Sequence, residues 1–212
     1  RMTESAYVSG IKLADARKTQ AETELSNLKS QLNPHFLFNT LNNIYALIDI
    51  DTERSKESVH DLSHLLRYVI YDTSSITVPL SGELAFIREY VHIESIRLAD
   101  QCDIQLRLPP VSGEIEIAPL LFLPFIENAF KHGISPTLPS FIHIRITTDE
   151  KCVVCDIENS YYPKAENDRS GHGIGLQQVQ RRLNLAYSGK YFWTHGVSDD
   201  GQTYRSIMTI YY

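Results

Sequence analysis

A histidine that directly follows a proline is the first group in the chain that could do covalent chemistry. It lies in residues 30–39, which read Ser-Gln-Leu-Asn-Pro-His-Phe-Leu-Phe-Asn. Three leucines precede it at helical spacing, and the stripe continues onto His35. Pro34 lacks a backbone donor and bends a helix at that point. Neutral imidazole is a nucleophile, so the stretch predicts either a reactive histidine at a helix bend or a core histidine bonded to an asparagine.

A second set of reactive side chains occurs in residues 124–133, which read Pro-Phe-Ile-Glu-Asn-Ala-Phe-Lys-His-Gly. On a helix, Glu127 and Lys131 share one face, and Asn128 and His132 share a neighbouring one. The amide oxygen of Asn128 could hold a hard cation, and the ammonium of Lys131 could meet a phosphate. The alternative is a polar last turn, capped by the glycine that follows and carrying a surface ion pair.

A glycine-rich loop lies directly before a predicted helix, in residues 171–176, which read Gly-His-Gly-Ile-Gly-Leu. Backbone donors in such a loop, at the positive end of a helix dipole, suit phosphate. Ordinary flexible turns use the same residues, and the loop is not a P-loop because no Gly-Lys-Ser/Thr follows.

Composition excludes several other classes of protein. The 212 residues carry a net charge of −6, which argues against a surface built for nucleic acid. Three cysteines do not make a disulfide framework, and the compartment is expected to be reducing. Cys152 and Cys155 are three apart in a predicted strand, where they point to opposite faces, so they do not predict a zinc site.

The elements that would position the histidine form a predicted helical hairpin. Residues 3–48 are expected to form one long helix bent at Pro34, and residues 52–71 form a second helix with its own apolar stripe. A lone hairpin cannot bury apolar surface on both sides. A homodimer that forms a four-helix bundle would bury it.

The elements that would position the other two motifs follow a break in the pattern near residue 77. A helix is predicted from an N-cap at Ser81 to Leu98, and the apolar period then changes to two. Strands are predicted around residues 104–108 and 142–146, and at 151–158, 191–197 and 203–211, with helices at 119–132 and 176–187 between them. The predicted fold is α+β: a dimerising helical hairpin at residues 1–77, then an α/β sandwich at 78–212 with helices on one face of a mixed sheet.

Taken together, the motifs resemble those of the LytS-type sensor histidine kinases, in order from about residue 24 to the C-terminus. The resemblance rests on residues 31–39 (Gln-Leu-Asn-Pro-His-Phe-Leu-Phe-Asn), residues 127–133 (Glu-Asn-Ala-Phe-Lys-His-Gly) and residues 173–176 (Gly-Ile-Gly-Leu), with Arg-Leu at 182–183. In that family the Pro-His motif carries the phosphorylated histidine, a role that falls here on His35. Asn39, four residues on, matches a position that orients water for dephosphorylation of the regulator.

The resemblance also implies the roles of an ATP-binding domain of the gyrase, chaperone and kinase type. Asn128 would bind Mg²⁺, Lys131 and His132 would face the phosphates of ATP, and Glu127 would be the general base. Either Glu158 or Asn159 would contact the adenine amine, where the family usually has Asp followed by Asn-Gly. The loop that closes over the phosphates would consist of Gly171, Gly173, Ile174, Gly175 and Leu176.

The function implied is ATP-dependent autophosphorylation followed by phosphotransfer to a response regulator, often one with a LytTR DNA-binding domain. The chain itself would act as a homodimer in the cytoplasm, without direct contact to nucleic acid. An upstream sensor segment, absent from this sequence, would place the full-length protein in the bacterial inner membrane. Two alternatives stay open: an ATPase of the same fold without phosphohistidine, and a degenerate dimeric scaffold that docks a regulator but binds no nucleotide.

Overall fold

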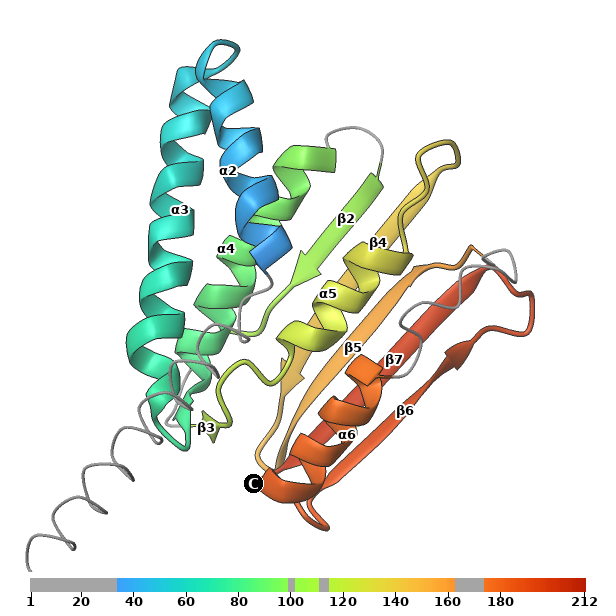
Figure 1. Cartoon of the computed structure of the whole chain (residues 1–212). Coiled ribbons are helices and arrows are strands. Elements are labelled where there is room, and N and C mark those ends of the chain that lie inside the picture. The colour runs from blue at the N-terminus through green and yellow to red at the C-terminus, as the bar shows by residue number, and fades with distance from the viewer. Residues whose placement is uncertain (1–33, 99–101, 111–114, 163–173) are drawn as a thin grey trace, which may run out of the picture.

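A computed structural model describes residues 34–98, 102–110, 115–162 and 174–212, and begins with the predicted hairpin (Figure 1). Helix α2 (Pro34–Ile48) and helix α3 (Thr52–Tyr71) run antiparallel, joined by a turn of three residues. The Asp51 carboxylate caps α3 by accepting from the Arg54 backbone N–H at 3.0 Å. The helix predicted upstream of Pro34, and therefore the bend at that proline, lies outside the described residues.

Helix α4 (Leu80–Leu98) packs along α3 and connects the hairpin to the rest of the chain. It begins at Leu80, one residue before the predicted N-cap, so Ser81 lies inside the helix; the Leu80 N–H, which has no partner within a helix, donates to the Ile115 carbonyl at 2.8 Å. A short 3₁₀ turn (Asp72–Ser74) and strand β1 (Val78–Pro79) precede α4, and β1 pairs antiparallel with β3 (Glu116–Ile117).

A mixed five-stranded sheet forms the second layer, in the order β2-β4-β5-β7-β6. The β2–β4 pair is parallel and the three remaining pairs are antiparallel. The strands span Cys102–Arg107 (β2), Ser140–Thr148 (β4), Cys152–Ser160 (β5), Tyr191–Val197 (β6) and Thr203–Tyr211 (β7). All five strands predicted for this sheet are confirmed, since alternate apolar side chains can be buried under the helices while their neighbours face outward.

Helices α5 (Leu123–His132) and α6 (Ile174–Ala186) lie with α4 on one face of this sheet, as predicted (Figure 1). The prediction that α5 begins at residue 119 is wrong. Leu120 has a φ of 53°, a left-handed conformation that a helix cannot contain, so the chain turns before it enters α5. Helix α6 begins two residues earlier than predicted.

One hydrophobic core continues from the hairpin into the sheet. Phe36 of α2 and Leu65 of α3 belong to the same buried cluster as Ile144 of β4 and Met208 of β7. Strands β1 and β3 both lie after the predicted boundary at residue 77, and the status of that boundary as a domain division stays a prediction.

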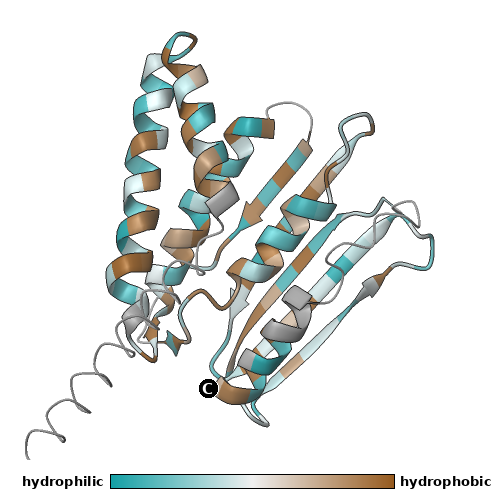
Figure 2. Cartoon of the chain, viewed as in Figure 1, coloured by the Kyte–Doolittle hydropathy of each residue, from teal (hydrophilic) through white to brown (hydrophobic). Residues whose placement is uncertain are grey.

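The opposite face of the hairpin carries exposed apolar side chains, and hydrophobic positions recur along both helices (Figure 2). On α2 they recur at spacings of three and four, and α3 adds two more: Phe38, Leu41, Tyr45, Ile48, Val59 and Ile70. We refer to these six residues as the outer hairpin face. Among the described residues, no helix is both long and apolar enough to cross a membrane.

Candidate nucleotide and phosphoacceptor site

The apolar side chains of helix α5 are buried, and their burial fixes the direction in which its polar side chains point. Pro124 lies in the first turn, where its missing N–H costs nothing, and Ile126 and Ala129 are fully buried. The helix ends at Gly133, whose N–H donates to the Ala129 carbonyl at 2.7 Å. The remaining face carries the polar residues predicted from the sequence: Glu127, Asn128, Lys131 and His132.

Glu127 lies in an environment that favours its neutral form. The pKa of its carboxyl is raised to about 7: burial is the largest cause, the nearby Glu94 carboxylate acts in the same direction, and Lys131 one turn on partly offsets both. A carboxyl group with a pKa near 7 can both accept and release a proton at neutral pH, which is what a general base needs.

The end of α5 lies against strand β5 at one close contact. A Cβ on Gly133 would come within 2.8 Å of both Cβ and Nδ2 of Asn159, so only glycine fits there. Asn159 is 2% exposed, and its Nδ2 donates to the Ser160 carbonyl at 2.8 Å. The structure therefore brings together the end of the predicted phosphate-binding helix and one of the two residues predicted for adenine contact.

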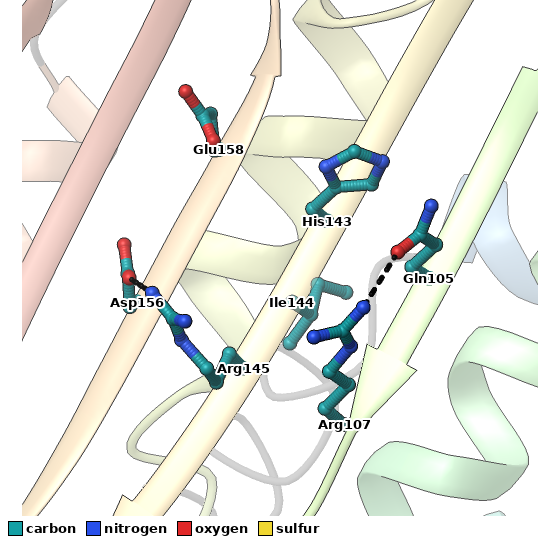
Figure 3. Close-up of a pocket in the computed structure, with 7 residues that line it drawn as sticks. All are labelled: Gln105, Arg107, His143, Ile144, Arg145, Asp156 and Glu158. Carbon is teal, nitrogen blue, oxygen red and sulfur yellow. Dashed lines mark hydrogen bonds and ion pairs between the residues drawn. The ribbon is translucent and has the colours of Figure 1, made fainter.

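Glu158, the other residue predicted for adenine contact, lies on the opposite face of the sheet. Successive side chains of a strand alternate, so Glu158 points away from α5. Figure 3 shows it in front of the sheet, with the helices behind. It lines a shallow cavity of about 140 Å³ with Gln105, Arg107, His143, Ile144, Arg145 and Asp156. In this cavity Asp156 accepts from Arg145 at 2.5 Å.

The hairpin contacts this helix through aromatic rings. Phe36, the residue directly after His35, stacks on Tyr90 of α4 with ring centroids 4.7 Å apart. Tyr90 in turn meets the edge of Phe130 in α5 at 6.2 Å. Burial raises the pKa of Tyr90 well above its ordinary value, and the Glu94 and Glu127 carboxylates add to the effect. The spacing of residues in the sequence could not predict this contact by Tyr90, because Tyr90 lies on a third helix between the two motifs.

Comparison with known proteins shows which family this chain resembles. The family model for histidine kinases matches residues 23–102. The chain is 31% identical to the sensor protein LytS of Oceanobacillus iheyensis over 84% of its own length, and 30% identical to the sensor histidine kinase/phosphatase LytS of Staphylococcus aureus over 95%. The chain is a homologue of the LytS-type sensor histidine kinases. It spans about a third of the length of these two relatives, 33% and 37%.

A solved structure similar to this LytS homologue is the histidine kinase domain of a blue-light activated histidine kinase from Erythrobacter litoralis EL346. The two share 15% sequence identity and superpose with a TM-score of 0.49, covering 91% of this chain and 95% of that one.

Several residues predicted for the site in this LytS homologue lie partly or wholly outside the described residues. Gly171 and Gly173 are among them. Ile174, Gly175 and Leu176 form the first turn of α6, and His35 lies in the first turn of α2, with only the backbone described in each case. Asn39 is half-buried one turn after position 35. The described part contains no group of three or more His, Cys, Asp or Glu side chains that could hold a metal ion.

Proposed function

We propose that this chain is the kinase region of a two-component sensor and uses ATP to phosphorylate His35. The observation that carries the proposal is Glu127, a carboxyl group with a pKa of about 7 on the helix that packs against the hairpin through Tyr90. Homology to LytS supports the same function.

In the proposed reaction a ring nitrogen of neutral His35 attacks the γ-phosphorus of ATP in line. The N–P bond forms as the P–O bond to ADP breaks, and the proton displaced from the imidazole passes to the Glu127 carboxylate. Phosphoryl transfer depends mainly on positioning and charge neutralisation, which is why few covalent groups are needed.

Helix α5 and strand β5 supply the chemistry to bind the nucleotide. Lys131 and His132 would meet the phosphates, and the loop before α6 would close over them. Asn159 lies on the α5 side of the sheet and offers an amide oxygen to the adenine amine, so we assign the adenine contact to Asn159 and not to Glu158. Asn128 has the oxygen donor that Mg²⁺ prefers, and bound Mg²⁺ would neutralise charge on the phosphates.

Two partners follow from the proposal. Sensor histidine kinases act as dimers and pass phosphate to response regulators. The outer hairpin face gives this chain an apolar surface for a second copy, and we assign the homodimer contact to it. The regulator would present an aspartate to phosphorylated His35, and it often carries a LytTR domain. Asn39 would later orient water for hydrolysis of the regulator's aspartyl phosphate. The full-length protein would sit in the bacterial inner membrane, with this region in the cytoplasm.

The proposal is tested by the chemistry of the label that the chain takes from γ-labelled ATP. A phosphoramidate survives alkali and is lost in acid, because protonation of its nitrogen creates a good leaving group. Acid-labile label supports the kinase, whereas ATP hydrolysis without any label would support the ATPase alternative. Calorimetric measurement of ATP binding with and without Mg²⁺ distinguishes the kinase and the ATPase from a scaffold that binds no nucleotide.

A further inference from the structure

A fully buried carboxylate, that of Glu83 in α4, lies where the hairpin meets the nucleotide-binding half of the chain. Its exposed fraction is 0%. Oε1 accepts from the Tyr68 hydroxyl at 2.6 Å and from the Leu120 backbone N–H at 2.6 Å. A buried carboxylate is costly unless donors hold it, and these two donors come from opposite sides of α4 in sequence.

The bond to Leu120 acts on the turn that aims α5. Leu120 is held in the left-handed region at a φ of 53°, which a leucine does not adopt without support from its surroundings. The chain then enters α5 at once, where the Phe122 carbonyl accepts from the N–H groups of Phe125 and Ile126. The backbone at Leu120 therefore sets where α5 begins and how its polar face is presented.

The bond to Tyr68 comes from the hairpin. Tyr68 lies on α3, and its ring packs against Phe86 with centroids 5.2 Å apart. Burial and the Glu83 carboxylate raise the pKa of the Tyr68 phenol far above its ordinary range, so the phenol keeps its proton and is the donor in this bond. The carboxylate thus receives one donor from the hairpin and one from the turn before α5.

We propose that Glu83 is a positioning residue for the kinase reaction: through Tyr68 and Leu120 it couples helix α3 of the hairpin to the start of the helix that carries Glu127. The inference rests on the proposed function for its catalytic consequence. In this proposal Tyr68 couples the hairpin to α5, and Leu120 orients α5 itself.

A matched control lies two residues away in the same turn. The Ala118 N–H donates to the Tyr187 hydroxyl at 2.7 Å, and Tyr187 directly follows α6. Tyr68→Phe and Tyr187→Phe each delete one phenol oxygen bonded to this region, but only the first breaks a connection to the hairpin.

The experiment measures the autophosphorylation rate at saturating Mg·ATP, the KM for ATP and the melting temperature of the chain and both variants. We expect Tyr68→Phe to lower the rate about tenfold with KM within twofold of the parent, since the substitution changes none of the groups proposed to bind the nucleotide. Tyr187→Phe should keep the rate within twofold. Glu83→Gln, if it folds, should lower the rate and raise KM. Equal rates for Tyr68→Phe and the parent, or equal losses in both phenylalanine variants, would overturn the proposal.

A second measurement separates this inference from the proposed function. In Tyr68→Phe the Leu120 amide should exchange with deuterium at least fivefold faster than in the parent, although Tyr68 is on the hairpin. Tyr204→Phe removes a hydroxyl bonded to His195 at the far edge of the sheet and should leave that amide unchanged. Unchanged exchange in Tyr68→Phe would refute the coupling, whether or not the parent is labelled by ATP.

Discussion

At the scale of single residues, the proposed reaction depends on the carboxyl group of Glu127. Its pKa is about 7 because burial and Glu94 both disfavour the charged form. A base must be ionised to accept a proton, so the autophosphorylation rate should fall as the pH drops below 7. His35 adds to the same trend, since an unperturbed imidazole with a pKa of about 6.5 becomes protonated and loses its lone pair in that range.

Glu127→Gln should therefore lower the autophosphorylation rate on the order of 100-fold while ATP still binds. It should also change stability in a pH-dependent way. The folded-state pKa is raised, so the stabilisation from this group is present below pH 4.5 and is lost as the pH rises through 7. At pH 8 the free energy of unfolding of the variant should exceed that of the parent by roughly 3 kcal/mol, and at pH 4 the two should be about equal. A flat stability difference across that range would contradict the assigned pKa.

Asn128→Ala should abolish Mg²⁺-dependent binding of ATP and leave the fold intact. The side chain is half-buried on the polar face of α5 and is not part of the core. Calorimetry with and without Mg²⁺ measures the loss, and far-ultraviolet circular dichroism checks the fold. If the Mg·ATP affinity of the variant equals that of the parent, Asn128 is not the metal ligand.

At the scale of elements, the apolar period predicted the types of nearly all helices and strands. Helix α3 and the five strands of the large sheet appear within about two residues of their predicted bounds, because each buries one face against a single neighbouring layer. The start of α5 could not be predicted. Residues 118–123 form an unbroken buried apolar run without period, so nothing in the sequence marks the left-handed turn at Leu120.

The candidate site could be predicted where its residues share one element and not where they meet through packing. Helical spacing placed Glu127, Asn128, Lys131 and His132 together, because they share one element. The pKa of Glu127 is raised first by burial and then by Glu94, which is more than thirty positions away, so both causes depend on the packing of the folded chain. The sequence likewise could not decide between Glu158 and Asn159 for the adenine contact, because the answer depends on which face of β5 the helices cover.

The outer hairpin face makes a prediction at this scale. Leu41→Glu places a carboxylate in the middle of that face, on a side chain that is 53% exposed in the single chain, so it should convert the dimer to a monomer without unfolding the hairpin. Ala46→Glu adds the same charge to an exposed position of α2 outside the apolar stripe and should stay dimeric. Light scattering at micromolar concentration measures both. A parent chain that is already monomeric would contradict the assigned interface.

At the scale of the whole molecule, one core joins the hairpin to the sheet, and two side-chain connections cross it. The aromatic rings of Phe36, Tyr90 and Phe130 form one connection, and the bonds of Tyr68 and Leu120 to Glu83 form the other. Both end in or directly before α5. This architecture links the helix that carries the proposed base to the helix that carries the proposed phosphoacceptor through Tyr90 of α4.

The measurement that tests the central claim most directly is the labelling of His35→Gln by γ-labelled ATP. The variant should bind Mg·ATP as the parent does, because the proposed nucleotide groups lie on α5 and β5, and it should take up no acid-labile label. His60→Gln, which changes an exposed histidine on the same hairpin, should be labelled like the parent. Acid-labile label that persists in His35→Gln would show that another histidine is the acceptor and would contradict the account.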